Sequence, residues 1–105
     1  MKLKKDVSIE KCRSEILIAA ISIIAPIFKL YGQEAVITSG TEKHKHSAHR
    51  SRHYSGDALD FRHRWFDHAT KLEIVSSLKD ELGANFVVIL EKTHIHIHYA
   101  PIFEA

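Results

Sequence analysis

The pattern of apolar and polar residues divides the chain into two helical segments and several extended ones. In the first helical segment, apolar residues recur at helical spacing over residues 9–24 and spread to all faces towards the end. Ser8 is a suitable N-cap, Pro26 should kink or divide the helix, and Gly32 should end it. Residues 1–7 form a basic lead that we expect to be frayed. The pattern therefore predicts one long, interrupted helix before Gly32.

A second stripe of helical spacing follows in the later half of the chain. Asp67 or a neighbour is suited to start this helix, and Gly83 is suited to end it. The apolar positions of the stripe are Leu72, Val75, Leu78 and Leu82. This spacing predicts a second helix with one buried face.

The extended segments are short. Residues 35–38 and 58–62 have strand character, residues 86–90 form a continuous apolar run that fits a central strand, and residues 94–99 alternate strictly. Together with the two helices they predict an α+β fold with a small, largely antiparallel sheet. A length of 105 residues fits one domain, residues 1–105, with one modest core.

Composition narrows the function classes. A hydrophobic content of 45% and a charged content of 27% are typical of a soluble globular protein. The net charge of +2 gives no reason to expect a nucleic-acid partner, and we expect a monomer. The single cysteine, Cys12, excludes an internal disulfide framework and a cysteine-rich zinc site. The apolar run 16–28 is too short to span a membrane, so we interpret it as a buried helix and expect synthesis in the cytoplasm without a signal peptide.

Histidine is the outlier of the composition. All nine histidines lie between His44 and His98, which indicates metal binding, proton transfer or both. A simpler interpretation, a solvated loop histidine, is preferred for His44, His63 and His68.

Two clusters of residues carry the candidate chemistry. His53 precedes a turn at Gly56, and Asp60 lies on the predicted strand that leaves this turn, so the two side chains can converge. Asp60 shares a face of that strand with Ala58 and Arg62. Imidazole and carboxylate groups are suitable zinc ligands, but two of them are too few to hold the ion.

The second cluster, residues 94–98, can supply the missing ligand. Its alternation places three imidazoles on one strand face and Ile95 and Ile97 on the other, buried one. Exposed strand faces seldom use histidine three times, because less reactive polar residues serve there. One histidine of this cluster would complete an open site in which zinc keeps a fourth position for water and lowers its pKa to about 7. The residues alone leave open whether His94 and His96 both bind the ion.

The fixed positions of the two clusters form a longer pattern, Ser51-x-His53-x-x-Gly56-x-Ala58-x-Asp60, followed downstream by His94-x-His96. This pattern resembles the zinc D-Ala-D-Ala carboxypeptidases and related peptidoglycan endopeptidases, whose fold is shared by the hedgehog signalling domain. The resemblance covers roughly residues 36–99. It implies a hedgehog/DD-peptidase fold and a zinc metallopeptidase that hydrolyses a D-Ala-D-Ala or L-Ala-D-Glu bond in peptidoglycan stem peptides. Such an enzyme would act on the cell wall or periplasm, in bacterial remodelling or in phage lysis.

The resemblance also assigns roles to the histidines. His53, Asp60 and His96 would bind one zinc ion per chain. His94 would stand beside the metal, in contact with substrate or with the developing oxyanion. His98 would lie outside the ligand set.

Further roles implied by the resemblance concern proton transfer and the oxyanion. Glu91 is expected to take a proton from water and pass it to the leaving amine. Strict strand alternation would turn Glu91 away from the histidines, so a turn or bulge at Lys92-Thr93 is required to bring it back. His46 is expected to reach over the site and stabilise the oxyanion or support the ligands.

One position departs from the family pattern. Many of the carboxypeptidases carry an arginine shortly after a Ser-Gly pair, where it polarises the scissile carbonyl, but here the sequence is Ser39-Gly40-Thr41-Glu42. Either His46, Arg50 or Arg62 takes that role, or the mechanism relies on zinc and His94.

Two alternative functions compete with a peptidase. The same fold can hold zinc for binding without hydrolysis, as hedgehog domains do. Metal-dependent enzymes that nick single-stranded DNA also use His-hydrophobic-His on a strand, but they need a nucleophilic tyrosine on a later helix. Only Ala-Pro-Ile-Phe-Glu-Ala follows Tyr99. The DNA-nicking hypothesis also leaves the pattern from His53 to Asp60 unexplained.

Overall fold

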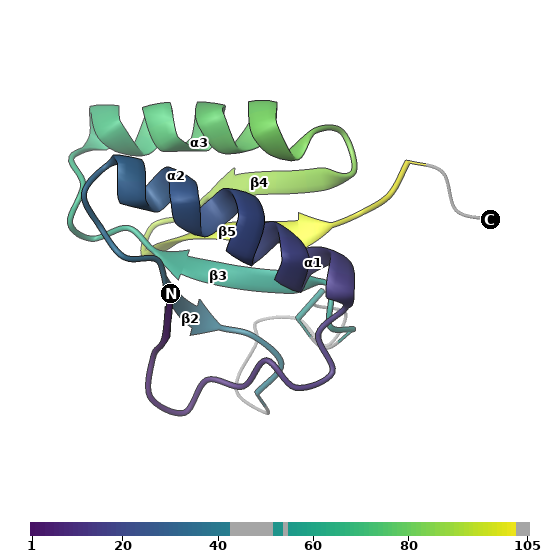
Figure 1. Ribbon diagram of the computed structural model, residues 1–105. Helices are drawn as coiled ribbons and strands as arrows, with labels where there is room; N and C mark the ends of the chain where they lie inside the picture. The colour runs from purple at the N-terminus through teal and green to yellow at the C-terminus, as the bar shows by residue number, and fades with distance from the viewer. Residues whose placement is uncertain (43–51, 54, 103–105) are drawn as a thin grey trace.

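A computed structural model describes residues 1–42, 52, 53 and 55–102 (Figure 1). Its centre is a five-stranded sheet with the order β1-β2-β3-β5-β4. The strands are β1 (Lys2–Leu3), β2 (Val36–Ser39), β3 (Ala58–Arg62), β4 (Phe86–Leu90) and β5 (His94–Tyr99). β1 pairs in parallel with β2, whereas the other neighbouring strands pair antiparallel. The predicted α+β class and the largely antiparallel sheet are confirmed.

Two helical segments lie over one face of the sheet (Figure 1). The first runs through α1 (Ser14–Ala19), a widened π-helical turn η1 (Ala20–Ile24) and α2 (Ala25–Leu30), and the second is α3 (His68–Leu82). The widened turn directly precedes Pro26, whose ring would collide with the carbonyl four residues earlier in a regular α-helix. The interruption that the sequence predicts at Pro26 is therefore present as a change of helical pitch within one continuous segment.

The core fills the space between the helices and the sheet. Leu59 and Phe61 of β3 pair across the strands with Ile97 and Ile95 of β5, and all four side chains are fully buried. Phe28 of α2 packs on Phe61 with a ring-centroid distance of 5.8 Å. Strand alternation then turns the neighbouring residues to the opposite face of the sheet, away from the helices. The cross-strand pairs on that open face are Ala58 with His98, Asp60 with His96, and Arg62 with His94.

The N-terminal segment differs from the prediction. Lys2 N donates to the Ala35 carbonyl at 2.9 Å, so residues 2 and 3 add a strand to the sheet and are not frayed. The helix begins at Ser14, not after Ser8. Asp6 and Lys11 adopt φ values of 67° and 65°. This left-handed conformation is incompatible with a helix over residues 9–13.

Two further predictions about burial were wrong. β4 was expected to be central but is the last strand in the order, and its Val87 and Ile89 are 37% and 39% exposed on the open face. Leu72 is exposed on α3, where Ile74 joins the buried stripe in its place.

The predicted cap of α3 is present, because the Asp67 carboxylate accepts a hydrogen bond from Thr70 N at 2.8 Å. None of the helices among the described residues is long and apolar enough to cross a membrane.

Gly56 is fixed by contact with the N-terminal segment. It has φ +79°, and a Cβ atom there would lie 2.2 Å from the Lys11 carbonyl oxygen. We expect Gly56→Ala to lower the free energy of unfolding by about 3 kcal/mol, because backbone strain and a backbone clash act together. Gly32→Ala is the matched control: φ is +84° but nothing lies within 4 Å, so strain alone should cost about 1 kcal/mol. Denaturant unfolding measures both variants, and equal losses would contradict a role for the Lys11 contact.

Candidate metal centre

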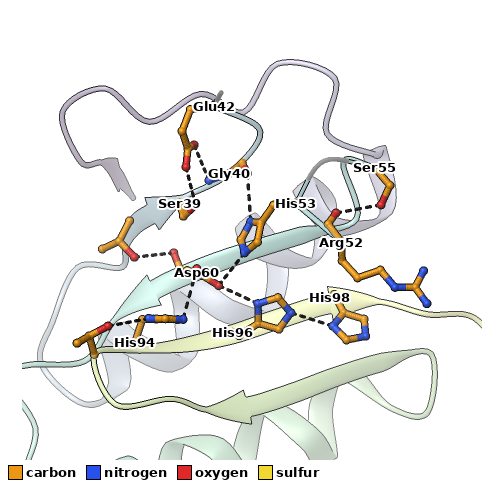
Figure 2. Close-up of polar contacts among 12 residues, drawn as sticks. Ser39, Gly40, Glu42, Arg52, His53, Ser55, Asp60, His94, His96 and His98 are labelled. Atoms are coloured by element: carbon orange, nitrogen blue, oxygen red, sulfur yellow. Dashed lines mark hydrogen bonds and ion pairs between the residues drawn. The ribbon is translucent and has the colours of Figure 1, made fainter. Parts of the chain in front are cut away.

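His53 is placed by the turn that precedes β3. Its backbone carbonyl accepts from Gly56 N at 3.1 Å, and its ring is buried, with 4% of the residue exposed. The Nδ1 atom lies 3.1 Å from the Gly40 carbonyl oxygen. A carbonyl only accepts, so we assign the hydrogen to Nδ1, which donates. The other nitrogen, Nε2, faces Asp60 (Figure 2); it donates to Asp60 while it carries a hydrogen and would bind a metal once that hydrogen is lost.

Asp60 lies at the centre of the histidines. Its Oδ1 atom is 3.1 Å from His53 Nε2 and 2.9 Å from His96 Nδ1, and its Oδ2 atom is 3.4 Å from His94 Nε2 (Figure 2). Burial alone would raise the pKa of Asp60, but the hydrogen bonds from His53 and His96 lower it well below its usual range. Burial would likewise lower the pKa of His53, but the hydrogen bond to Asp60 raises it. The cluster therefore stabilises positive charge beside a buried carboxylate.

The donor atoms match the dimensions of a metal site. One nitrogen each from His53 and His96 and one oxygen from Asp60 all lie within 4.8 Å of one another. Zinc bonds of about 2.0–2.1 Å in a tetrahedron place ligand atoms about 3.3 Å apart. The two histidine contacts to Asp60 are already close to that spacing, so small side-chain movements would complete the shell. These three residues, predicted as ligands from the sequence, could hold a metal ion.

His98 supports His96 from the side away from Asp60. His96 Nε2 and His98 Nδ1 are 2.9 Å apart. Burial, with the neighbouring charge of His96, lowers the pKa of His98 and so favours the form of the ring in which one nitrogen can accept a hydrogen bond. In the metal-free cluster His96 Nδ1 donates to Asp60; in a metal-bound form the remaining His96 hydrogen would be on Nε2, directed at His98, and Nδ1 would bind the ion. His98 does not belong to the group of His53, Asp60 and His96.

The backbone at Gly40, whose carbonyl orients His53, is held in place by the Glu42 side chain. The buried Glu42 carboxylate accepts from Gly40 N at 2.7 Å, from Ser39 Oγ at 2.5 Å and from Ser8 N at 3.2 Å. Burial would raise the pKa of Glu42, but the bonds from Ser39 and Gly40 lower it. Sequence reasoning missed this role and noted only that no arginine stands here. An acidic residue two positions after the glycine was the available signal.

The N-terminal segment also contacts this part of the backbone. Thr41 N donates to the Ser8 carbonyl at 2.7 Å, and Arg13 N donates to the Gly56 carbonyl at 2.9 Å. The Arg13 guanidinium also forms an ion pair with the buried Asp57 at 2.7 Å. Residues 8–13 therefore join the loop after β2 to the turn that carries His53.

Glu91 shares the open face of the sheet with the histidines. Its N–H donates to the His94 carbonyl at 2.9 Å, which places it directly opposite His94 across the turn at Lys92-Thr93. Opposite residues in an antiparallel pair point to the same face, so the chain reversal removes the outward orientation that strict alternation would give. The expected turn is present, and the Glu91 side chain is exposed.

The His63 side chain contacts the backbone of this turn. Its Nε2 lies 2.8 Å from the Glu91 carbonyl, and the residue is only 2% exposed. The prediction of a solvated loop histidine is wrong for His63, whereas His68 is exposed at the start of α3. His44, His46 and Arg50 lie outside the described residues.

Searches of protein-family models, of curated proteins and of solved structures found no match to this chain.

Proposed function

We propose that the protein is a zinc-dependent metallopeptidase that hydrolyses a peptide bond in peptidoglycan stem peptides, with a hedgehog/DD-peptidase type of fold. The observation that supports this proposal is the convergence of His53, Asp60 and His96. They come from a turn and two paired strands and present three ligand atoms within 4.8 Å on the open face of the sheet. The resemblance from Ser51 to Asp60 and at His94-x-His96 adds the substrate class.

A set of three ligands, which is what the described residues provide, favours catalysis over a structural metal. Structural zinc sites are closed by four protein ligands, whereas catalytic sites keep one position open. His94 approaches Asp60 through Oδ2, on the other oxygen from the one that His53 and His96 contact. It is therefore better suited to act beside the ion than to close its shell.

The remaining residues have complementary tasks. When bound, zinc would polarise the scissile carbonyl and activate water as a nucleophile. His94 Nδ1 lies 2.9 Å from Thr93 Oγ1, which fixes the ring so that Nε2 can donate to an oxyanion. Glu91, opposite His94, can receive a proton and return it to the leaving amine.

Mass spectrometry of purified muropeptides tests the proposal. Zinc-loaded protein should shorten a stem peptide by a mass that identifies the bond cleaved, and treatment with a chelator should stop the reaction. Asp60→Ala serves as the control for a contaminating hydrolase. Intact muropeptides after incubation with protein shown to contain zinc would favour the alternative, a domain of the same fold that binds zinc without hydrolysis.

A further inference from the structure

A pocket of about 640 Å³ opens beside the metal centre, between the end of β3 and the turn before β5. Asp60 and His94 form part of its wall, so it is continuous with the candidate site. Five cationic side chains line the rest, together with neutral polar groups. The five cations are Lys4, Arg62, Arg64, Lys71 and Lys92.

The charge of this pocket is strongly one-sided. The whole chain has 15 lysines and arginines against 13 acidic residues, yet the described residues that line the pocket include five cationic ones and a single acidic one, Asp60. Asp60 is already surrounded by three histidines. None of the five cations forms an ion pair with another described residue. Clefts lined by one sign of charge concentrate ligands of the opposite sign.

We propose that this pocket binds carboxylate groups of an acidic peptide substrate next to the bond that is cleaved. The inference rests on the proposed function and adds to it a requirement for negative charge at a defined end of the histidine row. Arg62 lies opposite His94 in the strand register, and Lys92 lies in the turn before His94, so both belong to the same end of the site.

The rest of the open face fits a peptide better than a nucleic acid. Ile89 and Val87 pair with His96 and His98 and expose apolar surface on the edge strand β4. The histidine row therefore has a cationic pocket at one end and an apolar border along one side. Sites for single-stranded nucleic acid combine cations with aromatic stacking platforms, but none of the described residues that line this pocket is Phe, Tyr or Trp, and Trp65 beside it has the Arg62 guanidinium 5.9 Å from its ring.

The test compares two labelled probes, a stem tetrapeptide with free carboxylates and the same peptide with its carboxylates amidated. Binding to the zinc-loaded protein is read by fluorescence anisotropy, at times when mass spectrometry finds the probe still uncleaved. The free acid should bind roughly fivefold more tightly than the amide at low salt, as two exposed charge contacts allow. The difference should shrink as salt rises.

Charge variants locate the effect. Arg62→Gln with Lys92→Gln should remove the preference for the free acid. Lys29→Gln with Lys79→Gln should preserve it, because these exposed lysines lie on α2 and α3 and do not line the pocket. Equal binding of the two probes by the unaltered protein, or a preference that survives the first double variant, would overturn the proposal.

Two more outcomes distinguish a failure of the carboxylate-binding proposal from a failure of the proposed peptidase function. A preference for the free acid without any hydrolysis would support carboxylate binding by the pocket and contradict the peptidase function. Hydrolysis without a preference for the free acid would support the peptidase function and contradict carboxylate binding by the pocket. A single-stranded DNA 12-mer that binds more tightly than the acidic peptide, and loses binding in the same double variant, would replace the peptide by a nucleic acid.

Discussion

Replacement of His53, Asp60 or His96 by alanine should abolish stoichiometric zinc binding. Elemental analysis should find close to one zinc equivalent in the unaltered protein and less than about a tenth of that in each variant, because a two-ligand remnant binds zinc poorly. Since metal binding couples to folding, each variant should also lose the rise in thermal stability that zinc gives the unaltered protein. An unaltered protein that takes up no zinc even when the metal is added would end the metal hypothesis.

His98→Ala and His94→Ala are the controls for this ligand set. His98 supports the Nε2 atom of His96 at 2.9 Å, so its loss should weaken zinc affinity by about tenfold without removing the site. His94→Ala should retain zinc because its contact is to Oδ2 of Asp60. Loss of zinc in His98→Ala with retention in His96→Ala would move the ligand by one strand repeat. A His94→Ala variant as depleted as His96→Ala would make His94 a ligand.

The sequence predicts the site well where the chemistry follows strand alternation. Residues of β5 alternate between buried isoleucines and histidines, and Asp60 pairs with His96, so Asp60 and the histidines had to share one face once these strands were neighbours. Gly56 marked the turn that brings His53 to Asp60, and it has the positive φ that such a turn requires. Local patterns were sufficient for these features.

The same reasoning fails where long-range contacts decide the backbone. Residues 8–13 have helical spacing of apolar side chains, but hydrogen bonds from Thr41 to Ser8 and from Arg13 to Gly56 hold them in an irregular course. Tertiary contacts of this kind override local propensity. Glu42 was missed for the same reason, since its role depends on partners at Gly40 and Ser8.

Glu91 is the residue whose predicted position changes most with the structure. Counting alternation through a continuous strand turns its side chain away from His94, but the chain reverses at Lys92-Thr93 and places the two residues opposite each other on one face. An exposed carboxylate opposite His94 is a candidate for the proton transfer that hydrolysis would need.

Glu91→Gln should therefore lower turnover of a peptidoglycan peptide by on the order of a hundredfold or more, because the amide keeps the size of the side chain but cannot accept a proton. Zinc content should stay near one equivalent, since no ligand is removed. Glu73→Gln, an equivalent change at an exposed position of α3, should leave turnover unaltered. The measurement is the rate of product formation by mass spectrometry on protein of verified zinc content. Near-native turnover in Glu91→Gln would reduce Glu91 to a turn residue, and the proton would then have to move through His94 or His46.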